Sequence, residues 1–176
     1  MKKLTYIILL LALAACGDNG FNQEPWLFDL RVSPEVAKVG ELVSVQIEFE
    51  PALSADVDDD LVADSTHVTI TLPPGVDFVA DSSDLYGGIF EGFEKRPPNV
   101  VQICRSGSRA ITYYLAPGEL PDDEQARIRL LGRVFEPSGS VSVEAAVQRE
   151  ITDPCFVGPD EREGVELVKV AAVSAP

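Results

Sequence analysis

Residues 42–49 read Leu-Val-Ser-Val-Gln-Ile-Glu-Phe, and this stretch decides the fold class. Apolar side chains occupy every second position from Val43 to Phe49, and polar side chains stand between them. Successive side chains of a β-strand point to opposite faces of the sheet, so the alternation predicts a strand with one buried face. A strand with its other face in water is typical of an antiparallel sheet.

The same alternation recurs along the chain after residue 25, and no long helical pattern interrupts it. Turn-forming residues separate the alternating stretches, as Pro73-Pro74-Gly75 does. About eight or nine short strands predict an all-β antiparallel sandwich or barrel, which we expect to form one domain over residues 25–173. The predicted strands lie near residues 26–33, 43–49, 67–72, 76–80, 100–104, 109–115, 126–134, 140–148 and 164–173.

Two segments resemble known families. Residues 33–45, with a proline-led turn and a glycine before the second strand, resemble the opening of bacterial immunoglobulin-like modules. Residues 68–79, which contain Leu-Pro-Pro-Gly-Val-Asp-Phe, are similar to a segment of conserved-repeat cell-surface domains. Those families are extracellular β-sandwiches that act as stalks, spacers or adhesive units. The resemblance implies a single immunoglobulin-like antiparallel β-sandwich with a structural or binding role.

The N-terminus has the composition of a secretory signal. Lys2 and Lys3 precede an apolar run of ten residues, 4–13, which is too short for a membrane span of about 20 residues. The run ends in Leu13-Ala14-Ala15-Cys16, which resembles the lipobox of bacterial lipoproteins. In that family the signal is removed before the cysteine, which then carries acyl chains such as palmitate. The resemblance implies a signal peptide over residues 1–15 and a lipidated Cys16 that anchors the protein in a lipid bilayer.

The alternative is an ordinary signal cleaved near Ala15, with Cys16 an incidental thiol. Gly17 stands where an aspartate would retain an enterobacterial lipoprotein at the inner membrane, so the resemblance favours the outer membrane, at its periplasmic or surface face. Residues 16–24 then form the lipidated cysteine and a polar tether rich in glycine and asparagine. The expected location is the bacterial cell envelope.

The charge of the chain excludes one class of partner. Its 176 residues hold 14 Lys+Arg and 29 Asp+Glu, a formal charge of −15, which becomes −17 if residues 1–15 are removed. Nucleic-acid binding depends on clustered cations that neutralise phosphates, so we expect no nucleic-acid partner. The same charge opposes close approach to an anionic lipid surface.

Two cysteines remain if Cys16 is lipidated. In an oxidising compartment such a pair indicates a disulfide, here Cys104–Cys155. The bridge would close a loop of about 52 residues, for which the chain-entropy model gives roughly 4 kcal/mol. The alternative is two separate thiols.

Four aspartates between residues 56 and 64 fall at the first, third, fifth and ninth positions of a calcium-loop pattern. Leu61 replaces the expected glycine and His67 the expected glutamate, so the pattern does not predict an EF-hand. A looser surface site is a weak calcium candidate, and a solvated acidic loop is the simpler interpretation. We therefore assign no metal and no cofactor. The weak candidates are Asp56, Asp58, Asp59 and Asp60.

Catalysis has no positive support in the sequence, which lacks GxSxG, HExxH, Walker and GxGxxG patterns. The one histidine, His67, lies on the polar face of its predicted strand, where we expect it to be exposed. The sequence therefore predicts a lipid-anchored, non-enzymatic envelope protein with a structural or protein-binding role. Two alternatives stay open: a small carbohydrate-active or ester hydrolase module with its site in the acidic loops, and a calcium-stabilised adhesive unit.

An insertion of about 19 residues separates the strands predicted near residues 80 and 100, and is longer than most β-connections. It carries aromatic residues around glycines and ends in a basic pair, a combination that is over-represented at binding sites. The aromatic rings either fold back as a lid over the sandwich or are displayed for a partner, and the basic pair would suit an anionic one. The candidate partner-binding residues are Tyr86, Phe90, Phe93, Lys95 and Arg96.

Overall fold

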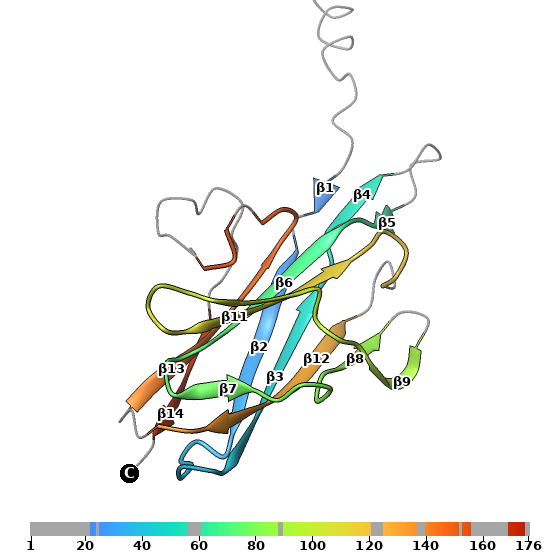
Figure 1. Cartoon of the computed structure of the whole chain (residues 1–176). Helices are drawn as coiled ribbons and strands as arrows, with labels where there is room; N and C mark the ends of the chain where they lie inside the picture. Colours follow the sequence, from blue (N-terminus) through green and yellow to red (C-terminus); the bar gives the residue numbers. More distant parts are fainter. Residues whose placement is uncertain are drawn as a thin grey trace, which may run out of the picture.

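The computed structural model describes residues 22–23, 25–55, 61–87, 90–120, 125–136, 140–151, 153–155 and 169–174 (Figure 1). All the regular secondary structure in these ranges consists of β-strands. None of the described residues forms a helix that is long and apolar enough to cross a membrane. The strands are β1 (Asn22–Gln23), β2 (Trp26–Ser33), β3 (Leu42–Glu50), β4 (Leu53–Ala55), β5 (Leu61–Ala63), β6 (Thr66–Leu72), β7 (Val76–Phe78), β8 (Asp84–Gly87), β9 (Phe90–Lys95), β10 (Val100–Ile103), β11 (Arg109–Leu115), β12 (Ala126–Val134), β13 (Ser140–Gln148) and β14 (Lys169–Ser174).

The strands form an antiparallel β-sandwich of the immunoglobulin-like kind, which confirms the predicted fold class. One layer, which we call the β12 sheet, has the order β2-β3-β12-β8-β9, with β7 also paired to β12. The other layer, the β6 sheet, has the order β10-β11-β6-β13-β14. A small third sheet, β1-β4-β5, lies at the end of the sandwich where β1 enters (Figure 1).

The core fills the space between the two layers with side chains that alternate along each strand. Val43, Val45, Ile47 and Phe49 of β3 are completely buried, as the sequence pattern predicted. Each such side chain contributes roughly 1.5–3 kcal/mol by leaving water. The largest fully buried side chains include Tyr113, Phe49, Leu27, Ile47, Ile70 and Leu72.

The polar hydroxyl of Tyr113 is satisfied inside this core. Its oxygen lies 2.6 Å from Ser83 Oγ, so the two hydroxyls form a hydrogen bond. Burial raises the pKa of Tyr113 to about 12, the Ser83 bond opposes that rise, and the charge of Asp84 adds to it. The phenol therefore stays neutral at physiological pH.

Strand β2 differs from the simple alternation because it contains a β-bulge between Leu27 and Asp29. A bulge places one extra residue in a strand and so moves the following side chains to the other face. Leu27 is completely buried while Trp26 is exposed, and Leu30 and Val32 then face the core. The strand predicted near residues 26–33 is confirmed, and Trp26 lies on its outer side.

The segment between residues 80 and 100 is also more regular than a long loop. Residues 84–87 and 90–95 form the hairpin β8–β9, and β8 pairs with β12 in the register Arg129↔Asp84. The hairpin therefore widens the β12 sheet to its edge (Figure 1). The strands predicted near residues 100–104 and 109–115 are confirmed and pair as the hairpin β10–β11, and the strand predicted over residues 140–148 is confirmed as β13. The last strand begins at Lys169, and residues 164–168 of its predicted range lie outside the described residues.

Candidate binding surface

Arginines occupy the outer face of β12. Arg127, Arg129 and Arg133 alternate with Ile128 and Leu130, which are completely buried. Because β12 lies between β3 and β8, these guanidinium groups project from the middle of the β12 sheet.

Two of the predicted aromatic residues lie against these arginines. Tyr86 of β8 and Phe93 of β9 have ring centroids 5.4 Å apart and planes tilted by 44°. Arg127 Cζ lies 5.7 Å from the centroid of Tyr86, and Arg129 Cζ lies 4.6 Å from that of Phe93. Both distances are within the range of cation–π attraction.

Asp84 holds the cations of this surface in place. Its Oδ1 lies 2.8 Å from Lys95 Nζ, and its Oδ2 accepts a 2.7 Å hydrogen bond from Arg129 Nη2. The hydrogen bond from Lys95, followed by that from Arg129, lowers the pKa of the Asp84 carboxyl despite its burial. Arg127 Nη2 similarly donates to Glu48 Oε1 at 3.0 Å. We call this set the arginine–aromatic surface; its members are Glu48, Asp84, Tyr86, Phe93, Lys95, Arg127 and Arg129.

Arg96 is placed differently from its neighbour Lys95. Its Nη1 and Nη2 donate to the two carboxylate oxygens of Glu119 at 3.0 and 3.1 Å, and Nη2 also donates to the carbonyl of Tyr114 at 3.1 Å. Burial works to raise the pKa of Glu119, but the Ala116 amide and the Arg96 guanidinium lower it overall. Arg96 therefore links the segment after β9 to the end of β11 in the β6 sheet. Lys95 and Arg96, the basic pair of the sequence, thus have different partners and different roles.

The exposure of the aromatic residues distinguishes a lid that folds back over the sandwich from rings that are displayed for a partner. The Phe93 residue is 43% exposed, and Tyr86 is half-buried on the outer face of the sheet. A lid over the core would bury such a ring, so this geometry favours display. The side chain of Phe90 lies outside the described residues. The arginines were missed from the sequence, although the alternation of residues 126–130 could have placed them on one outward face.

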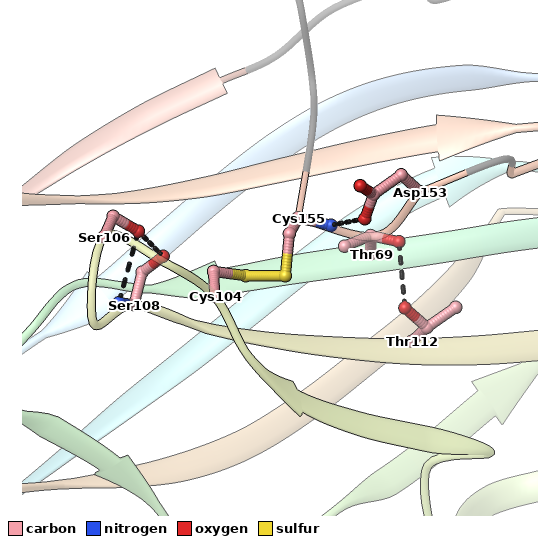
Figure 2. Close-up of a disulfide and its surroundings, with 7 residues drawn as sticks. All are labelled: Thr69, Cys104, Ser106, Ser108, Thr112, Asp153 and Cys155. Carbon is pink, nitrogen blue, oxygen red and sulfur yellow. Dashed lines mark hydrogen bonds between the residues drawn. A yellow bond between two sulfur atoms is a disulfide. The ribbon is translucent and has the colours of Figure 1, made fainter.

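The opposite outer face, on the β6 sheet, is covered by the chain itself. The predicted disulfide between Cys104 and Cys155 is present, with Cα atoms 5.4 Å apart (Figure 2). It fastens a segment that we call the strap, residues 149–151 and 153–155. Arg149 follows β13 while Cys104 follows β10, so the strap crosses β6 and β11 diagonally.

Residues beneath the strap are buried although they point away from the core. Thr69 and Thr112 are almost completely buried, and their hydroxyl oxygens lie 3.1 Å apart in a hydrogen bond (Figure 2). His67 Nδ1 lies 2.7 Å from the Arg149 carbonyl, and its ring lies 5.0 Å from that of Tyr114. The expectation of an exposed His67 was therefore wrong: the residue is half-buried, because the strap and Tyr114 partly cover it.

A depression of about 510 Å³ lies beside the disulfide, between the end of β10 and the strap. Both cysteines that line it are bonded to each other, so neither supplies a thiolate nucleophile. In the part of the chain that the structure describes, no group of three metal-ligating side chains is found. The calcium candidates Asp56, Asp58, Asp59 and Asp60, as well as Cys16, lie outside that part. The depression is lined by Gln102, Ile103, Cys104, Arg105, Ser106, Asp153 and Cys155.

Solved structures with a similar fold include bacterial surface proteins. The fimbrial protein FimP from Actonomyces oris matches with a TM-score of 0.53 and 9% identity, over 85% of this chain and 37% of that one. The collagen-binding domain from a Staphylococcus aureus adhesin matches with a TM-score of 0.45 and 7% identity, over 90% and 97%. AvmM, which catalyses macrocyclization in alchivemycin A biosynthesis, matches with 0.44 and 13%, over 90% and 89%. At such identities the likeness to FimP shows the fold alone.

The sequence matches no known protein family and no curated protein sequence.

Proposed function

We propose that this chain is a lipid-anchored, non-enzymatic protein of the bacterial cell envelope that binds a protein partner through the arginine–aromatic surface. In this proposal residues 1–15 are a removed signal, Cys16 carries the acyl chains and residues 16–24 form a tether. Residues 25–173 form one immunoglobulin-like domain. Gly17 after the cysteine favours the outer membrane.

The observation that carries the binding role is the exposed Phe93 ring beneath Arg129, on a sheet face that has no covering segment among the described residues. Arginine and tyrosine are among the residues most enriched at energetic centres of protein interfaces, and phenylalanine is enriched in interface cores. The Phe93 ring is also preorganised, because Arg129 and Tyr86 hold it on two sides. Little side-chain freedom would be lost on binding.

The envelope location has separate support. The lipobox-like residues 13–16 follow an apolar run of signal-peptide length, and two or three acyl chains anchor a protein stably. The Cys104–Cys155 disulfide suits an oxidising compartment outside the cytosol. With Cys104 and Cys155 bonded to each other, neither cysteine supplies a thiolate nucleophile.

One experiment tests anchoring. Cys16→Ser should release the protein from membranes or leave its signal uncleaved, while the wild-type chain should gain the mass of acyl chains. Unchanged membrane association of the variant would contradict lipidation.

A second experiment tests binding by photo-crosslinking in the cells that produce the protein. A photoreactive phenylalanine replaces Phe93 in one variant and Tyr114 in another. Tyr114 is a matched control because it is a similarly exposed aromatic residue on the other sheet. We expect discrete protein adducts from position 93 only. Equal adducts from both positions, or none from position 93, would contradict the binding role.

A further inference from the structure

The ion pairs of the β12 sheet share an orientation in which the cation faces water. The Lys95 side chain is 69% exposed and that of Arg129 43%, whereas the Asp84 side chain between them is 11% exposed. The Arg127 side chain is 41% exposed and its partner Glu48 18%. The carboxylates lie deeper in this face than the cations that they hold.

Among the described residues, ion pairs whose two partners do not both lie on strands of the β12 sheet have the opposite orientation. The Arg109 side chain, bonded to Asp77, is 26% exposed while that of Asp77 is 42% exposed. The acid is also the more exposed partner in the pairs Arg96–Glu119 and Arg149–Asp64. The greater length of basic side chains therefore does not explain the outward cations of the β12 sheet.

The strand register gathers these cations on one face. Arg31, Gln46, Arg129, Asp84 and Lys95 form a single row across β2, β3, β12, β8 and β9. Neighbouring strands are about 4.8 Å apart, so the cations of this row repeat at roughly 10 Å. Along β12 the outward arginines at positions 127 and 129 are roughly 7 Å apart. Together with Arg133, five of the chain's 14 basic residues lie here.

We propose that this face recognises an acidic segment of a protein, whose carboxylates pair with Arg127, Arg129 and Lys95 while an apolar side chain contacts Phe93. The inference rests on the proposed function, since it names the chemistry of the partner for the same surface. Cations that project from a chain of formal charge −15 provide local charge complementarity to carboxylates. The planar guanidinium groups match the geometry of carboxylates.

Two other anionic partners fit less well. A flat anionic bilayer would meet the repulsion of the whole acidic chain, whereas a peptide segment meets only this face. A sugar ring stacks best on a flat aromatic platform, but the rings of Tyr86 and Phe93 are tilted by 44° and Arg129 lies over Phe93.

The test is the fluorescence anisotropy of labelled oligoglutamate titrated with the mature lipidated protein in neutral detergent micelles. We expect binding that weakens as salt is raised. Lys95→Gln and the double variant Arg127→Gln/Arg129→Gln should weaken it, the latter by about tenfold or more, equivalent to about 1.4 kcal/mol. Lys95→Gln keeps the test valid if the double variant does not fold, because the Lys95 side chain is largely in water.

Matched controls remove the same charge elsewhere. Arg105→Gln and the double variant Lys38→Gln/Arg105→Gln change exposed residues outside this face and should stay within about twofold of wild type. Equal losses in the controls, or no binding of oligoglutamate to wild type, would overturn the proposal. Tighter binding of polygalacturonate or of phosphatidylglycerol vesicles than of oligoglutamate would also overturn it.

The two proposals fail separately. Adducts at position 93 without oligoglutamate binding would leave the binding role standing and overturn the acidic partner. Oligoglutamate binding without adducts in cells would overturn the binding role itself.

Discussion

The outer faces of the two sheets differ in whether another segment of the described chain covers them. On the β6 sheet the strap crosses the strands and buries the Thr69–Thr112 pair under a disulfide-fastened segment. On the β12 sheet the outward positions of β12 carry Arg127 and Arg129, whose side chains are 41% and 43% exposed beside aromatic rings. The strands of both sheets alternate in the same way, so alternation alone does not reveal which outer face is open.

The residue types on each outer face match its degree of burial. Threonine hydroxyls can be buried when they bond to each other, whereas a buried arginine without a partner would be costly. The covered face therefore contributes to stability, and the outer face of the β12 sheet is the one that no other described segment covers.

Removal of the disulfide should cause the largest loss of stability. Cys104→Ser/Cys155→Ser should lower the free energy of unfolding by about 4 kcal/mol, because the bridge joins residues 51 positions apart. Urea denaturation measures the loss, and Ser106→Ala in the adjacent turn is the control. A loss below about 1 kcal/mol would show that the strap is not held mainly by the bridge.

The buried threonine pair should show strong coupling. Thr112→Val leaves the Thr69 hydroxyl buried without its partner and should cost about 1–3 kcal/mol. The double variant Thr69→Val/Thr112→Val should recover most of that loss, because both polar groups are then gone. Additive losses in this double-mutant cycle would mean that the pair is hydrated rather than covered.

Asp84 should matter less, because both of its cations already face water. Asp84→Asn should cost about 1 kcal/mol at pH 7, because the two cations that lose their partner are partly exposed and stay hydrated. The folded protein holds the pKa of Asp84 below its usual value, so this stability is present above about pH 4 and is lost as the pH falls further. Unfolding measured at pH 7 and pH 3 should show a smaller difference between variant and wild type at pH 3 than at pH 7. An equal difference at both pH values would exclude an electrostatic role.

Phe93→Ala should have the smallest effect on stability, less than about 1 kcal/mol, since the residue is displayed rather than buried. Thermal unfolding beside Tyr114→Ala provides the comparison. A loss of 1–3 kcal/mol would instead identify the hairpin as a lid over the core.

The sequence predicted those features of the fold that depend on local residue patterns. The alternations at residues 43–49 and 140–148 specify strands because each apolar position must reach the core, and two remaining cysteines outside the cytosol specify a bridge. The β8–β9 hairpin was missed because its strands are short and rich in glycine. The bulge at Leu27–Asp29 leaves no clear signal in the apolar pattern.

The composition of the candidate site depends on long-range register. Tyr86 and Phe93 were selected for their residue types, but their contact with Arg127 and Arg129 depends on the pairing of β8 with β12. No local rule places residues about 40 positions apart side by side. The covering of His67 likewise depends on the strap, which lies about 80 positions further along the chain. No local pattern indicates this contact, and His67 was therefore expected to be exposed.

Hydroxyl-radical footprinting of the protein in its native envelope and after purification tests the central claim most directly. In the purified protein Phe93 and Tyr114 should both be labelled, since both are partly exposed. In the envelope Phe93 should become protected by its partner, while the labelling of Tyr114 stays unchanged. Equal labelling of Phe93 in both samples, or protection of Tyr114 alone, would contradict the assignment of the β12 sheet as the binding face.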